Sequence, residues 1–166
     1  MKLIAETPRL LLRELQPTDA QSFYALNANP NVIRYTGNTA FANVEEAKEF
    51  LENYSDYQLN GYGRWAVILK DSGQFIGWCG LKYDGDTQQT DIGFRFFEEE
   101  WGKGYATESA EACLRIGFDQ LGLACIIGRA MKANIASICV LEKLGLTYEQ
   151  DIVLEGEEAV LYQIKQ

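Results

Sequence analysis

The stretch WGKGYATES, residues 101–109, decides how this chain folds. A strand-like run, residues 90–97, precedes it, and apolar residues recur at helical spacing after it. Gly102 and Gly104 allow the main chain to turn tightly between the two elements. The first turn of a helix has free N–H groups, and the helix dipole adds about half a positive charge there. The pattern therefore predicts a loop that binds an anion such as a phosphorylated group.

Two well-known phosphate-binding loops do not fit this stretch. A P-loop requires Ser or Thr directly after its lysine, but Gly104 follows Lys103. A dinucleotide-binding fingerprint requires a third glycine where this chain has Thr107. Either the loop belongs to another class of anion site, or its two glycines serve only to shape a strand-to-helix turn.

The composition is that of one globular domain, which we expect to span residues 1–166. Apolar residues make up 47% of the chain and aromatic residues 12%, which is enough for a substantial core. No apolar run approaches the roughly 20 residues of a membrane span. Residues 1–6 reach charged positions too early for a signal peptide. We therefore expect a cytoplasmic protein with no membrane partner.

Charge and reactive residue types narrow the chemistry further. The net charge of −9 disfavours DNA and favours basic partners, although it can also be ordinary solubilising charge. The chain has no histidine, which excludes His-based metal sites and the usual general base, so no metal is expected. The four cysteines lack any paired spacing and are interpreted as small buried apolar residues: Cys79, Cys113, Cys125 and Cys139.

The order of the predicted elements indicates a mixed sheet. Three middle strands joined by short turns form an antiparallel meander, after which helix and strand alternate. The expected strands are residues 9–15, 64–70, 75–83, 90–97, 124–131, 146–151 and 159–164. The expected helices are residues 18–27, 44–57, 104–120 and 134–144.

A second motif, NIASICVLEKLG at residues 134–145, strengthens the interpretation of the loop. Together the two segments resemble the GNAT superfamily of acetyl-coenzyme A-dependent N-acetyltransferases. That family's pyrophosphate loop reads [Arg/Gln]-x-x-Gly-x-[Gly/Ala] and matches residues 101–106, with Trp101 at its first position. The opening TPRLLLR, residues 7–13, is similar to the RimJ/RimL-like branch, which acetylates ribosomal-protein N-termini and usually has Trp there. The resemblance runs from Thr7 to about Tyr162.

The resemblance implies an α/β (α+β) fold with three layers. A mixed, mainly antiparallel sheet would have helices on both faces. Its two central parallel strands, ending here near Phe97 and Met131, would splay apart and admit acetyl-CoA between them. The residues that the resemblance places at the cofactor are Phe96, Phe97, Gly102, Lys103, Gly104, Tyr105, Ala106, Thr107, Asn134 and Lys143.

Several of these assignments have simpler alternatives. Main-chain N–H groups of the loop would hold the pyrophosphate, and the main chain of residues 95–97 would polarise the thioester carbonyl, with Phe96 packing on the acetyl group. Lys103 and Lys143 can equally be solvated surface lysines. Asn134 can be a helix cap without any ligand contact.

Two catalytic residues follow from the resemblance. Asp91, where RimL-like enzymes usually have glutamate, would accept the proton of the amine, directly or through a water molecule. Ser137, on the same helix face as Asn134, would hydrogen-bond the departing thiolate. The alternative for Asp91 is a structural ion pair with Arg95, two residues away on the same strand face.

The reaction implied is direct acetyl transfer to a primary amine in a ternary complex, by a monomer or homodimer. An α-amine with a pKa near 8 is about 10% neutral at pH 7, whereas a lysine-like amine is only about 0.1% neutral. A chain without histidine therefore suits a protein N-terminus or another weakly basic small-molecule amine. The alternatives are an antibiotic or polyamine acetyltransferase, or a non-catalytic CoA-binding or interaction module. Residues 34–36, which follow the first helix, are expected to contribute to the acceptor site.

Overall fold

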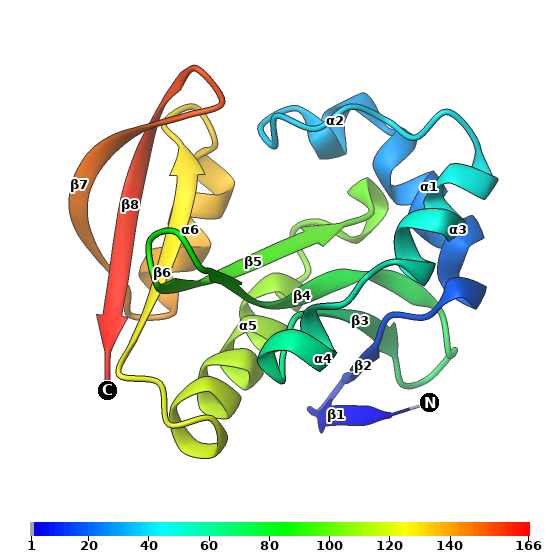
Figure 1. Ribbon diagram of the computed structural model, residues 1–166, viewed down its shortest axis with the longest axis horizontal. Helices are drawn as coiled ribbons and strands as arrows, with labels where there is room; N and C mark the ends of the chain where they lie inside the picture. The colour runs from blue at the N-terminus through cyan, green and yellow to red at the C-terminus, as the bar shows by residue number, and fades with distance from the viewer. Residues whose placement is uncertain (1) are drawn as a thin grey trace.

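The computed structural model describes residues 2–166, which form one eight-stranded sheet (Figure 1). The strands lie in the order β1-β2-β3-β4-β5-β6-β8-β7. Neighbouring strands are antiparallel except β5 and β6, which are parallel. The bounds are β1 (Leu3–Glu6), β2 (Leu10–Glu14), β3 (Arg64–Leu69), β4 (Phe75–Asp84), β5 (Gln89–Phe96), β6 (Cys125–Met131), β7 (Thr147–Leu154) and β8 (Glu157–Lys165). The expected mixed, mainly antiparallel sheet is confirmed.

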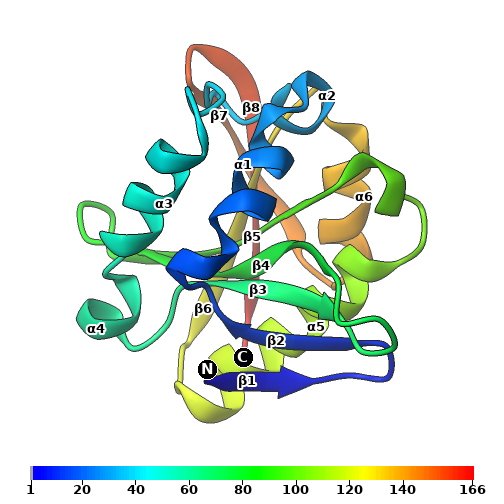
Figure 2. The same ribbon diagram turned by 90° about the vertical axis from the view of Figure 1, so that its right-hand side faces the viewer.

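Helices cover both faces of the sheet, as Figure 2 shows, with α1 and α3 above strands β2–β4 and α5 beneath them. Alternation along β3 builds both cores, because Val67 packs in the cluster between the sheet and α5 while Ala66 and Ile68 pack toward α1 and α3. The helices are α1 (Ala20–Ala28), α2 (Pro30–Ile33), α3 (Val44–Glu52), α4 (Asp56–Asn60), α5 (Tyr105–Arg115) and α6 (Ile135–Lys143). Short 3₁₀ turns lie at Pro17–Asp19 and Glu98–Glu100, and a π-helical turn at Ile116–Gln120 continues α5.

The parallel strands β5 and β6 separate along their length (Figure 1). Among the described residues they share one register pair, Asp91 with Ile127. By contrast, β5 pairs with β4 at eight positions, and β6 pairs with β8 at seven. Each strand therefore follows its antiparallel neighbour, and the sheet opens between them toward the end of β5. This confirms the expected splayed central pair.

Three local features differ from the sequence prediction. The helix expected over residues 44–57 is two helices, α3 and α4, with a turn at residues 53–55 between them. Leu3–Glu6 forms a strand that had not been expected, and the segment at Pro30 forms the short helix α2 instead of a simple turn. Within residues 2–166, no helix combines the length and the apolar character needed to cross a membrane.

Candidate active site

The loop between β5 and α5 depends on its two glycines. Gly102 has a φ of 75° and Gly104 a φ of 85°, a region that residues with a side chain rarely adopt. A Cβ at Gly102 would meet no atom within 4 Å, so conformation rather than crowding requires glycine there. Gly104 is also the N-cap of α5, and no side chain caps that helix. The first turn of α5 is therefore left open at its N-terminus.

The main-chain N–H groups of residues 102–107 have no partner among residues 2–166. Within the described part of the chain, none of these six donates a hydrogen bond to another protein group. The first internal bond of α5 runs from Glu108 N–H to the Gly104 carbonyl, at 3.0 Å. Unsatisfied N–H groups at a helix N-terminus, together with the positive end of the helix dipole, form a site for an anion. The arrangement fits a diphosphate.

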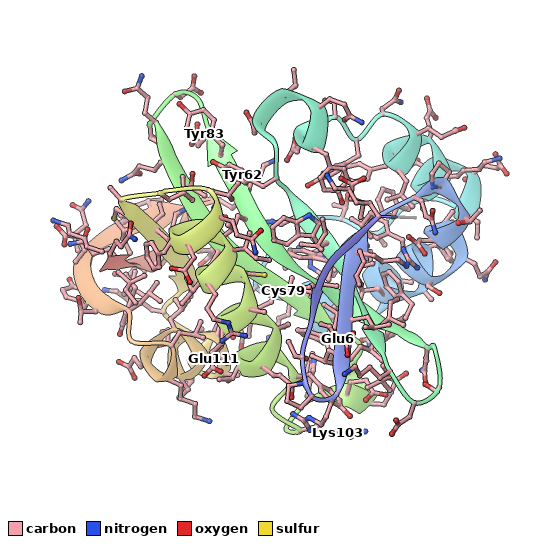
Figure 3. All side chains as sticks on the ribbon, turned by 90° about the horizontal axis from the view of Figure 1, so that it is seen from below. Glu6, Tyr62, Cys79, Tyr83, Lys103 and Glu111 are labelled. Atoms are coloured by element: carbon pink, nitrogen blue, oxygen red, sulfur yellow. The ribbon has the colours of Figure 1, made fainter. Side chains whose placement is uncertain are left out.

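A set of contacts from the turn between β1 and β2 fixes this loop. The Arg9 Nε donates to Glu108 Oε1 at 2.7 Å, and its Nη1 donates to the Lys103 carbonyl at 2.9 Å. Thr7 donates from its hydroxyl to Glu108 Oε2 at 2.6 Å, and the Arg9 guanidinium lies 4.5 Å from the centre of the Tyr105 ring. Figure 3 places Lys103 beside the β1–β2 turn. We name these contacts of Thr7 and Arg9 with the loop and α5 the clamp.

The clamp also holds Glu108 ionised. Partial burial by itself would raise the pKa of Glu108, but hydrogen bonds from Thr7 and Arg9 outweigh it and lower that pKa. Thr7 and Arg9 lie in the TPRLLLR motif noted in the sequence, and Glu108 lies in the WGKGYATES motif. The presence of both motifs in one chain could have indicated the clamp, but no contact between the two motifs had been predicted.

A groove of about 530 Å³ continues from the loop along α5. It brings together three of the predicted cofactor residues: Gly104, Thr107 and Lys143. Arg115 also lines this groove and had not been predicted. The Lys103 ammonium, in contrast, pairs with Glu100 at 3.2 Å, so its charge is already partly compensated.

Two of the residues expected from this helix lie at the first turn of α6. The Asn134 side chain caps the helix by accepting a hydrogen bond from the Ser137 N–H at 3.3 Å. The capping alternative for Asn134 is therefore present, and a cap remains compatible with a ligand contact. Ser137 is half-buried. Its hydroxyl makes no hydrogen bond with another group in residues 2–166.

The end of β5 presents its main chain to the opening between the strands. Phe97 N–H donates to the Ile76 carbonyl on β4, at 3.1 Å. Because N–H directions alternate along a strand, the Phe96 N–H faces the side from which β6 has separated. The Phe96 ring is buried in the core between the sheet and α5, and the Phe96 carbonyl accepts a hydrogen bond from Trp101 Nε1 at 2.9 Å. Phe96 thus offers its N–H, while its ring has a packing role.

Asp91 is bound by two arginines at the point where β5 and β6 still pair. Its Oδ1 accepts from Arg64 and its Oδ2 from Arg129, each at 2.7 Å. Burial alone would raise the pKa of Asp91, but the charges and hydrogen bonds of the two arginines outweigh it and lower the pKa below 3.8. The alternative of an Asp91–Arg95 pair is wrong, because Arg95 instead donates to amide oxygens of Asn27 and Asn38.

Open parallel strands, a free-amide loop at the end of one of them and a groove beyond the loop match the layout that the resemblance implies for an enzyme that transfers an acyl group from a coenzyme A thioester. The sequence matches the family model of the acetyltransferase (GNAT) domain over residues 9–147. The chain belongs to this family and is an acetyl-CoA-dependent acetyltransferase.

Known relatives agree with this assignment. An uncharacterized N-acetyltransferase of Bacillus subtilis, YnaD, is 35% identical over 145 residues, covering 86% of this chain and 82% of its own. A GNAT-family acetyltransferase structure from Bacillus anthracis is 28% identical, with a TM-score of 0.82 and coverage of 99% and 98%. The Vibrio cholerae spermidine N-acetyltransferase, solved with CoA and spermine, shares the fold at a TM-score of 0.82 and 22% identity, covering 96% and 97%.

Proposed function

We propose that this enzyme acetylates a primary amine by direct transfer in a ternary complex, with the diphosphate of acetyl-CoA on the amides of residues 102–107. The observation that carries the proposal is the set of six free N–H groups on a glycine-shaped helix N-terminus. Acetyl-CoA supplies the activated acetyl group as a thioester. The whole chain, residues 1–166, would act as one catalytic domain.

Main-chain and side-chain groups near the opening suit the chemistry. The Phe96 N–H would hydrogen-bond the acetyl carbonyl, where negative charge develops during transfer. Asn134 would position the pantetheine arm, and the Ser137 hydroxyl would hydrogen-bond the departing sulfur. Lys143, in the groove beyond Gly104, would contact the far end of the cofactor.

Among the described residues, removal of the proton from the amine lacks a strong general base at this site. Asp91 is a weak base because both carboxylate oxygens are engaged by arginines. We therefore assign Asp91 a positioning role, in which it joins β5 to β3 and β6. The ammonium proton would then leave to solvent, which suits an amine that is partly neutral at pH 7.

Two kinds of acceptor are candidates for this site. The TPRLLLR motif favours the RimJ/RimL-like branch and hence a protein N-terminus. The similarity in fold to a spermidine acetyltransferase supports a small-molecule amine as the second candidate. Either acceptor would react with acetyl-CoA bound at the same loop and at the same opening between β5 and β6.

Thermal melting with acetyl-CoA tests the proposal. A ligand at 100 times its Kd stabilises by about 2.7 kcal/mol, which corresponds to a rise of about 5–11 °C for a chain of this size. Gly104→Val should lose this rise and also the release of free thiol with a broad amine panel. Gly73→Val is the control, because Gly73 shares the positive φ of Gly104, at 74°, but lies in the β3–β4 turn, where a Cβ would meet no atom within 4 Å. An equal ligand-induced rise in both variants would contradict the assignment of the loop.

A further inference from the structure

Arg95 has a charge that no carboxylate balances. Its Nη1 donates to Asn27 and its Nη2 donates to Asn38 at 2.9 Å. These acceptors are neutral amide oxygens, and within residues 2–166 no carboxylate oxygen lies within 4 Å of the guanidinium. A guanidinium has five N–H donors, so three remain after these two bonds. Arg95 is half-buried, so part of the residue remains exposed.

Arg95 is one of three arginines that gather on one face of the sheet. Arg64 and Arg95 each lie 5.2 Å from the centre of the Trp78 ring, and Arg129 approaches from β6. Asp91 is the carboxylate among them, so the four side chains carry a net charge of +2. This local excess is opposite in sign to the −9 of the whole chain.

The uncompensated charge is costly where Arg95 lies. Burial, together with the nearby charge of Arg64, lowers the pKa of Arg95 to about 10. A buried charge normally has an opposite charge as its partner. Glu155, whose side chain lies against Gly37, next to Asn38, forms no ion pair with Arg95 within residues 2–166.

The position of Arg95 relates this charge to the reaction. Arg95 directly precedes Phe96, whose N–H faces the opening between β5 and β6. Side chains alternate along a strand, so Arg95 extends from the face opposite the Phe96 ring. That face is covered by α1 and the segment after α2, since Arg95 bonds Asn27 in the last turn of α1 and Asn38 after α2. Residues 34–36, which were expected to contribute to the acceptor site, lie along the chain between these two partners of Arg95.

We infer that the acceptor amine also carries an oxyanion, a carboxylate or a phosphate, which Arg95 binds. The inference rests on the proposed transfer to an amine at this opening. A planar guanidinium with free donors matches either group through paired hydrogen bonds. A polyamine would instead bring positive charge toward Arg64, Arg95 and Arg129. The carboxylates that would suit a polyamine lie elsewhere, in a separate groove beside α3 whose wall includes Glu46, Glu49 and Asp56.

Matched acceptor pairs test the inference. Thiol release from acetyl-CoA is measured with amino acids against their carboxamides, with O-phosphoethanolamine against ethanolamine, and with spermidine. The amino-acid pairs report a carboxylate and the ethanolamine pair a phosphate. The oxyanion member of at least one pair should have at least a tenfold higher kcat/KM. Arg95→Gln should reduce that ratio to about twofold or less, chiefly through KM, and Arg95→Lys should restore part of it.

Controls separate this inference from the proposed function. Lys48→Gln removes a positive charge from the exposed surface of α3 and should keep the full ratio. A merely structural role for Arg95 would lower activity on both members of a pair equally, and that result overturns the inference. Preference for spermidine or the neutral amines also overturns it, while leaving the proposed function intact. Failure of acetyl-CoA to raise the melting temperature overturns both.

Discussion

Removing Arg9 tests whether the clamp prepares the loop for the cofactor. Arg9→Ala loses an ion pair with Glu108, a hydrogen bond to the Lys103 carbonyl and the contact with the Tyr105 ring. The Arg9 side chain is 46% exposed, so each interaction is worth about 0.2–1.5 kcal/mol. We expect the loss to weaken the binding free energy of acetyl-CoA by about 1–2 kcal/mol, because in the variant the ligand must order a loop that the clamp no longer holds. That weakens the Kd for acetyl-CoA by about 5- to 30-fold.

Isothermal titration with acetyl-CoA measures this effect, and Lys70→Ala is its control. Lys70 forms a 2.7 Å ion pair with Glu6 near the same strands but has no contact with the loop. Its loss should change the Kd by less than twofold. An Arg9→Ala variant that binds acetyl-CoA as tightly as the wild type would refute the role of the clamp.

Glu108→Gln distinguishes the clamp from a direct effect of the Arg9 charge. If Arg9 acts by holding the loop, this variant weakens binding as well, because both anchoring oxygens lose their charge. If Arg9 instead attracts the phosphates directly, the variant frees the guanidinium and removes a negative charge beside the loop, so binding tightens. We expect weaker binding.

The other predictions concern Asp91 and Ser137. Asp91→Asn should lower the free energy of unfolding by about 3–5 kcal/mol, since Arg64 and Arg129 lose their buried partner; urea denaturation measures it. Because the folded-state pKa of Asp91 is lowered, its contribution is present above the ordinary value of 3.8 and is lost as pH falls through the folded value. The difference in the free energy of unfolding between wild type and variant should therefore disappear only in acid. A difference that disappears near pH 6 would contradict the lowered pKa of Asp91. Ser137→Ala should lower kcat about tenfold or more while the Kd for acetyl-CoA stays within twofold; an unchanged kcat would remove Ser137 from the mechanism.

The sequence predicted the sheet well because its strands alternate clearly and its turns are short. The prediction was wrong where contacts between distant residues determine where a helix or strand begins and ends. Tyr54 and Tyr57 lie in the stretch expected as one helix, yet their hydroxyls bond the Arg64 main chain, with Tyr57 also accepting from Leu15. These bonds accompany the break between α3 and α4. The strand Leu3–Glu6 has four residues and exists through pairing with β2, so its own pattern is too short to recognise.

The candidate site was predicted where one continuous segment forms it and missed where distant segments meet. The loop and helix start are local, so Gly102 and Gly104 could be read from the sequence. The partners of Asp91 could not, because Arg64 lies 27 positions before it and Arg129 lies 38 positions after it. A single sequence does not state which charges will meet, and the alternative of a pair with Arg95, which lies nearer along the chain, was therefore wrong.

The opening between β5 and β6 follows from how each strand is held, independently of any ligand. Phe97 keeps β5 on β4 through its bond to Ile76, and β6 remains paired with β8 along its whole length. Asp91 joins the two strands at the closed end through Arg129. Beyond that point, the β5 main chain keeps the Phe96 N–H directed at a missing neighbour, and such a group needs a partner. The amides of the pantetheine arm can supply one, so the gap and the loop would both be formed before acetyl-CoA arrives.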